Sequence, residues 1–87
     1  MFTIHIVTPQ KVYADFEAKI LNLRTTDGQI GLLTDHMSYL ATLVEGEMNF
    51  VDEYNIRHHY LIGEGVVYFD NNVANLLLDR IDPIEKV

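Results

Sequence analysis

The clearest structural signal in this sequence is one segment, Asp27-Gly28-Gln29-Ile30-Gly31-Leu32-Leu33-Thr34-Asp35-His36. It holds two glycines three residues apart, an apolar run after them and a closing histidine. Because glycine tolerates a positive φ angle, Gly28 after Asp27 predicts a tight turn. The apolar residues from Ile30 to Leu33 predict a short buried strand, and the polar residues up to His36 predict a loop.

Strand-like patterns continue through most of the chain, with a period close to two. Turn signals such as Gly63-Glu64-Gly65 and Asn71-Asn72 separate the runs. These patterns indicate an all-β fold, either a β-sandwich or a barrel, and we predict an antiparallel β-sandwich of roughly eight to ten short strands. Residues 36–43 are the only segment in which a helical turn could form. The runs that predict strands are residues 2–7, 12–13, 21–24, 30–33, 40–44, 47–50, 56–62, 66–69 and 73–78.

Length and composition predict one globular domain over residues 1–87. The sequence is 48% apolar and 22% charged, and a chain this short buries roughly 60% of its unfolded surface. No apolar run approaches the ~18 residues of a membrane span, and the N-terminus has no secretory signal pattern. The absence of cysteine excludes disulfides and thiolate chemistry and fits a reducing compartment.

The charge balance argues against nucleic acid as a partner. Thirteen acidic side chains face six basic ones, which gives a formal net charge of -7. Such a surface repels phosphate backbones. An acidic body can still lie at a membrane if a protein partner holds it there. The basic residues form no cluster along the chain; they are Lys11, Lys19, Arg24, Arg57, Arg80 and Lys86.

Two local patterns invite a chemical interpretation that the residues do not support. The pair Gly28 and Gly31 is not a phosphate-binding loop of the Walker type, because no Lys-Ser/Thr follows it. Asp35, His36 and Ser38 include the residue types of a catalytic triad, but a triad is a spatial arrangement and nothing here supplies an oxyanion hole. We expect no catalytic residue and no cofactor.

The four histidines do not predict a metal centre. His58 and His59 are adjacent, so on a strand their side chains point to opposite faces and cannot bind one ion. His5 and His36 have no further ligand at a metal-binding spacing. We expect no metal site, and strand histidines that are solvated or hydrogen-bonded.

Several segments, in order, resemble the epsilon subunit of F-type ATP synthases, which is called delta in mitochondria. The family's typical run Gly-Glu-Leu-Gly-Ile-Leu-Pro-Gly-His is similar to residues 28–36, with Gln29 in place of Glu and Thr34 in place of Pro. Residues 6–13 resemble the family's Val-Thr-Pro-Glu-Lys start, and residues 73–79 resemble Lys-Val-Thr-Val-Leu-Ala-Asp. Proline is absent at positions 34, 38 and 45, which concerns the shapes of the loops more than the fold.

The resemblance implies a flattened β-sandwich and a non-catalytic central-stalk subunit. Such a subunit couples the gamma subunit to the membrane c-ring during ATP synthesis driven by an ion gradient. The chain would then be a monomer when isolated and would reach the membrane only through the complex, at the cytoplasmic face in bacteria or the equivalent organellar face. We expect the family's C-terminal two-helix hairpin, which carries inhibition and ATP binding, to be absent, whether naturally or by shortening.

The resemblance also implies contact residues. Gln29 and His36 correspond to family positions at the c-ring, and Tyr39 and Thr42 are candidates for the gamma interface, with Leu40 expected in the core. Without the resemblance, the segment around Gln29 would be interpreted as an ordinary exposed loop. Two rival functions are a β-sandwich interaction module of another complex and a small cupin-like metalloenzyme, which would need clustered histidines.

Overall fold

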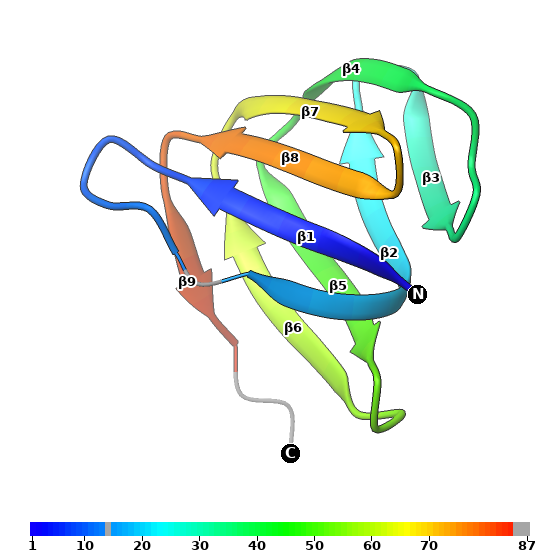
Figure 1. Ribbon diagram of the computed structural model, residues 1–87. Helices are drawn as coiled ribbons and strands as arrows, with labels where there is room; N and C mark the ends of the chain where they lie inside the picture. Colours follow the sequence, from blue (N-terminus) through cyan, green and yellow to red (C-terminus); the bar gives the residue numbers. More distant parts are fainter. Residues whose placement is uncertain (14, 85–87) are drawn as a thin grey trace.

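The computed structural model describes residues 1–13 and 15–84, which form nine β-strands joined by short connections (Figure 1). The predicted all-β class is confirmed, and within the described residues there is no helix that could cross a membrane. The strands are β1 (Phe2–Val7), β2 (Phe16–Thr25), β3 (Gly28–Leu33), β4 (Tyr39–Leu43), β5 (Gly46–Asp52), β6 (Arg57–Ile62), β7 (Gly65–Asp70), β8 (Val73–Leu78) and β9 (Ile81–Pro83).

The strands form two layers that meet along β2 (Figure 1). One layer has the order β1-β8-β7-β4, and the other contains β3, β2, β5, β6 and β9. β2 pairs with β1 near its start and with β3 and β5 further along, and its last residue, Thr25, pairs with Leu43 of β4. A register shift between Ala18 and Ile20 marks a β-bulge in this strand, which increases its bend.

All strand pairs are antiparallel except β1 and β8, which run parallel with Ile4 opposite Ala74. This is a departure from the purely antiparallel arrangement that the sequence predicts. Alternation within a strand fixes which side chains face inward, but it does not identify the neighbouring strand or its direction.

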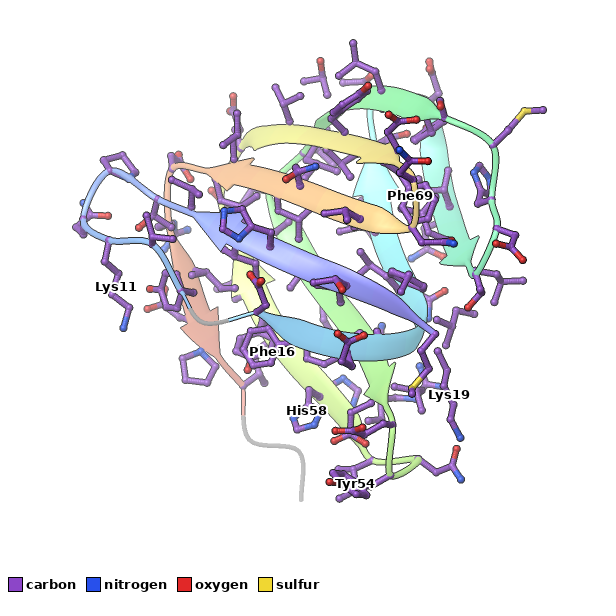
Figure 2. All side chains as sticks on the ribbon, viewed as in Figure 1. Lys11, Phe16, Lys19, Tyr54, His58 and Phe69 are labelled. Carbon is purple, nitrogen blue, oxygen red and sulfur yellow. The ribbon has the colours of Figure 1, made fainter. Side chains whose placement is uncertain are left out.

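The core lies between the two layers, where alternate side chains of each strand meet. Phe2 and Phe69 contact edge to face, with ring centroids 5.4 Å apart. Figure 2 shows Phe16 and His58 near each other at the end of the sandwich away from Phe69, and Phe50 contacts both of their rings. The larger buried side chains are Phe2, Ile4, Ile6, Leu21, Leu23, Leu32, Leu43, Met48, Phe50, Ile62, Phe69 and Leu76.

Two tight turns form as the sequence predicts. Gly28 has a φ angle of +114°, in the region that favours glycine, and it ends the turn between β2 and β3. Asn71 and Asn72 have φ angles of 51° and 58°, as required at both central positions of a type I′ hairpin turn.

Two sequence-based expectations were wrong, those for Leu40 and for residues 12–13, and the helical turn that residues 36–43 could have formed is not there. Leu40 is not a core residue: it is 68% exposed, because β4 turns Tyr39, Ala41 and Leu43 inward and leaves Leu40 on the outer face. No helical turn forms in residues 36–43, which run into the extended strand β4. Val12 makes only an isolated bridge to Val7, so residues 12–13 are not a full strand.

Candidate functional site

An apolar patch covers part of the outer face of the β4-β7-β8 layer. It consists of Leu40, Val66, Tyr68 and Leu77, whose residues are 68%, 36%, 46% and 56% exposed. Leu40 lies opposite Tyr68, and Val66 lies opposite Leu77, so the four side chains are neighbours across three strands. A cluster of large apolar side chains on the outside of a small domain is typical of a surface that another protein covers.

The two candidate residues for the gamma interface lie on opposite sides of β4. Thr42 is exposed and lies opposite Val66, so it borders the apolar patch. Tyr39 is half-buried and packs against the core. The signal that separates them is the alternation along residues 39–43, in which Leu40 and Thr42 share the outer face.

The loop of residues 34–38 connects β3 to β4 and carries His36. Asp35 adopts a φ angle of 64°, and its backbone N–H donates to Oδ1 of Asn72 at 2.7 Å. The Asn72 amide returns a hydrogen bond from Nδ2 to Oδ1 of Asp35 at 3.0 Å. Ser38 Oγ donates to Oδ1 of Asp70 at 2.6 Å. The loop is therefore tied at two points to the β7–β8 hairpin.

The His36 ring is held by its neighbours although the residue is exposed. Its centroid lies 6.0 Å from that of Tyr39 and 5.9 Å from that of Phe69, both nearly perpendicular. Nδ1 lies 2.7 Å from the carbonyl oxygen of Met37. Because a carbonyl oxygen can only accept, Nδ1 carries the proton, and Nε2 of the neutral ring is an acceptor.

Gln29 lies apart from His36. It is exposed at the start of β3, opposite Arg24 of β2, whereas His36 follows the other end of the same strand. Gln29 and Leu33 are four strand residues apart, which corresponds to about 13 Å. The turn beside Gln29 instead adjoins β4, since the Thr26 N–H donates to the Thr42 carbonyl at 3.1 Å. The two candidate c-ring residues are thus separate points and not one cluster.

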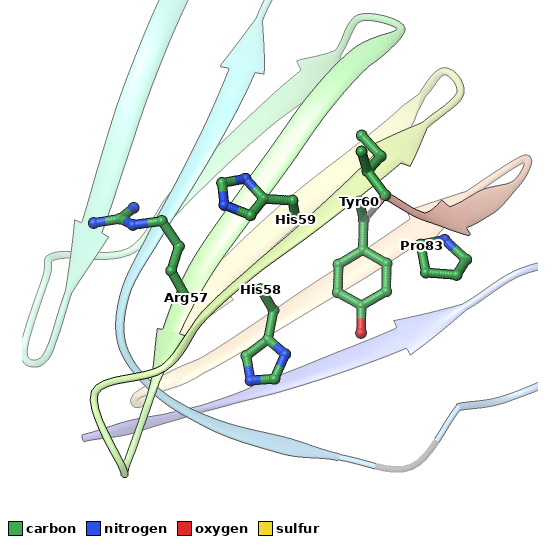
Figure 3. Close-up of a pocket in the computed structure, with 6 residues that line it drawn as sticks. Arg57, His58, His59, Tyr60 and Pro83 are labelled. Carbon is green, nitrogen blue, oxygen red and sulfur yellow. The ribbon is translucent and has the colours of Figure 1, made fainter. Parts of the chain in front are cut away.

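A hollow of about 270 Å³ lies along β6 and the end of β9, lined by Arg57, His58, His59, Tyr60, Pro83 and Ile84. Figure 3 shows that Arg57 and His59 extend to one side of β6, and His58 and Tyr60 to the other. The prediction that adjacent histidines face opposite ways is confirmed. Among residues 1–13 and 15–84, no group of three or more metal-ligating side chains comes together.

Each histidine of β6 instead pairs with a carboxylate. His58 Nε2 lies 2.7 Å from Oδ2 of Asp52, and His59 Nδ1 lies 3.1 Å from Oε2 of Glu47. The hydrogen bond with His58 lowers the pKa of Asp52, and the backbone N–H groups of Ile56 and Tyr54 lower it further. Burial raises the pKa of Tyr60. The two histidine–carboxylate pairs thus connect β6 to β5.

Asn72 and Asp70 are the residues that sequence reasoning missed. They lie 37 and 32 positions from their partners Asp35 and Ser38. The Asn71-Asn72 pair signals a turn, but no local pattern shows that the second side chain binds a distant loop.

Comparison with known proteins gives a consistent family. Residues 1–84 match the family described as ATP synthase, Delta/Epsilon chain, beta-sandwich domain. The chain is similar to the ATP synthase epsilon chain of Ruminococcus albus, at 31% identity over 94% of this chain and 61% of that protein. It is also similar to the sodium ion specific epsilon chain of Propionigenium modestum, at 27% identity over 99% and 62%.

Solved structures show the same fold. A chain of the Euglena gracilis mitochondrial ATP synthase superposes with a TM-score of 0.84 at 17% identity, over 97% of this chain and 54% of that one. A chain from the central stalk and c-ring of the Tetrahymena thermophila mitochondrial ATP synthase gives 0.76 at 17% identity, over 92% and 64%. The chain spans about three-fifths of the length of the curated relatives it matches. It belongs to the delta/epsilon family of ATP synthase subunits, a family of non-catalytic chains, and contains their β-sandwich domain.

Proposed function

We propose that this chain is a central-stalk subunit that holds the gamma subunit to the membrane c-ring of an F-type ATP synthase. It would reach the membrane only through that complex, on the cytoplasmic face in bacteria or the equivalent organellar face. The observation that carries the proposal is the apolar patch of Leu40, Val66, Tyr68 and Leu77 on one layer, apart from Gln29 on the outer face of the other. A coupling part needs two contact surfaces.

Gamma is the proposed occupant of the apolar patch, with Thr42 at its border. The centres of protein interfaces are rich in apolar and aromatic side chains, and Tyr68 and Leu40 supply these. Tyr39 would then contribute indirectly, because it lies on the inner side of β4 and its ring packs against the core and the His36 ring.

The c-ring is the proposed partner of Gln29 and His36. Both side chains are polar and exposed, and they lie near the two ends of β3. This spacing suits a broad, shallow contact with polar loops of a ring better than insertion into a single pocket.

Sedimentation of the chain alone and with gamma tests the proposal. We expect a monomer alone and a one-to-one complex with gamma. Leu40→Lys should weaken the complex roughly thirtyfold, because charging a central apolar residue costs about 2 kcal/mol of binding free energy. Leu33→Lys is the matched control, since Leu33 is also exposed but lies on the outer face of the other layer.

A stable homodimer, or no complex with gamma, would contradict the proposal and favour an interaction module of another complex. Equal weakening by Leu40→Lys and Leu33→Lys would show that gamma does not dock on the apolar patch.

A further inference from the structure

The hydrogen bonds between the 34–38 loop and the β7–β8 turn form a clamp whose centre is Asn72. The Asn72 side chain makes two hydrogen bonds to Asp35. Its oxygen accepts from the Asp35 N–H at 2.7 Å, and its nitrogen donates to the Asp35 carboxylate at 3.0 Å. The Ser38 hydroxyl adds a bond of 2.6 Å to Asp70, on the other side of the same turn.

His36 lies between the two residues of the loop that the clamp holds. Asp35 and Ser38 are fixed to the turn on either side of it, and the His36 ring packs against Phe69, the residue before Asp70. The ring proton stays on Nδ1 only while the Met37 carbonyl remains within hydrogen-bonding distance. The loop conformation therefore determines which ring nitrogen is left as the acceptor.

We infer that Asn72 is a positioning residue that fixes the 34–38 loop so that His36 offers Nε2 as a hydrogen-bond acceptor to a partner. The partner group is a donor, such as an amide, hydroxyl or guanidinium. This inference rests on the proposed function, in which the partner is the c-ring. A loop that is ordered before it binds loses less conformational entropy on contact, so the clamp strengthens a small polar interface.

Glycine substitution separates the Asn72 side chain from its backbone. Asn71 and Asn72 both have φ angles in the left-handed region, at 51° and 58°, and glycine adopts that conformation without strain. Asn72→Gly removes both hydrogen bonds from the Asn72 side chain to Asp35 and leaves the turn possible. Asn71→Gly is the matched control, because it changes the neighbouring position of the same turn.

The first arm measures the clamp by NMR on the chain alone. In Asn72→Gly the Asp35 amide should exchange roughly tenfold faster, as two hydrogen bonds are lost. Ring ¹⁵N shifts should show His36 moving from the Nδ1–H tautomer to a mixture, while Asn71→Gly stays as the parent protein. An unchanged tautomer and exchange rate in Asn72→Gly would overturn the inference. If Asn72→Gly does not fold, Asn72→Asp keeps a residue type that tolerates the left-handed region but replaces the Nδ2 donor to Asp35 by a second carboxylate, and it is judged by the same criteria.

The second arm measures ions pumped per ATP hydrolysed in the reassembled synthase. Asn72→Gly should lower this ratio and Asn71→Gly should not, and this result supports the inference. If His36→Ala lowers the ratio and Asn72→Gly leaves it at the parent level, the positioning role is overturned and the His36 contact stands. If His36→Ala also leaves it unchanged, the c-ring contact at His36 fails, and the positioning role falls with it.

Discussion

The two outer faces of this sandwich differ in the polarity of the side chains that they expose. On the β4-β7-β8 layer, the apolar patch presents Leu40, Val66, Tyr68 and Leu77. On the β2-β5-β6 layer, polar side chains bond to one another: Asn22 and Arg57 both donate to Oδ1 of Asn49, at 3.0 and 2.6 Å, and His59 pairs with Glu47.

Strand alternation alone does not identify a contact surface. Both faces are the outward side of regularly alternating strands. On the polar face the side chains satisfy one another, so it is stable when solvated. On the apolar face the side chains contribute stabilisation only when a partner covers them, by roughly 25 cal/mol per Å² of apolar surface removed from water.

The largest expected difference between the layers is in the free energy of unfolding, when one glycine of each layer is replaced by alanine. A Cβ at Gly65 would lie 2.1 Å from the Leu77 carbonyl oxygen, so Gly65→Ala must push β7 and β8 apart and should cost about 3 kcal/mol of unfolding free energy. A Cβ at Gly31, in the polar layer, would lie 3.2 Å from Oδ1 of Asn22 and 3.8 Å from Cδ1 of Ile20, both side-chain atoms. Gly31→Ala should change stability by less than about 1 kcal/mol.

Urea unfolding of both variants measures these costs. Equal midpoints for Gly65→Ala and Gly31→Ala would mean that the β7–β8 contact is not as tight as described.

A middle-sized effect is expected from breaking the polar network. Asn49→Ala removes the acceptor that the Asn22 amide and the Arg57 guanidinium share, and should cost about 1 kcal/mol of unfolding free energy. Leu40→Lys, on the apolar face, should stay within about 0.5 kcal/mol of the parent protein, because Leu40 is largely exposed in the isolated chain. Thermal melts compare the two, and a larger loss in Leu40→Lys would mean that Leu40 packs within its own chain.

The smallest expected effect is a pH dependence located at Asp52. Its pKa is lowered from the ordinary value of 3.8 in the folded state, so the pair with His58 contributes stability above that value and loses it as the pH falls through the lowered pKa. Asp52→Asn cannot titrate, so its stability should fall less steeply than that of the parent protein as the pH is lowered through the ordinary value of 3.8 and below. Denaturant melts over this acid range measure the difference, and identical acid profiles would rule out this contribution.

Much of the fold was predictable because the relevant signals are local. Alternation predicted most of the strands, and Gly28 and Asn71-Asn72 predicted two turns through their backbone requirements. Leu40 was misplaced because apolar character suggests burial, whereas its position in the β4 alternation puts it outside.

The contacts between distant segments were not predictable in this way. The parallel pairing of β1 and β8 and the bonds from Asn72 to Asp35 depend on where the chain returns in space. Thr42 and Leu40 show this limit most clearly. From the sequence, Thr42 is predicted at an interface and Leu40 in the core, whereas both residues lie on the same outer face of β4.

The bulged strand β2 has a mechanical consequence. It belongs to both layers, because its first residues pair with β1, its middle pairs with β3 and β5, and its end reaches β4. A force applied to the outside of one layer is therefore carried into the other through a continuous covalent backbone, in addition to side-chain packing. The sandwich resists sliding of one layer over the other, so a rotation imposed at one outer face reaches the opposite one with little lag.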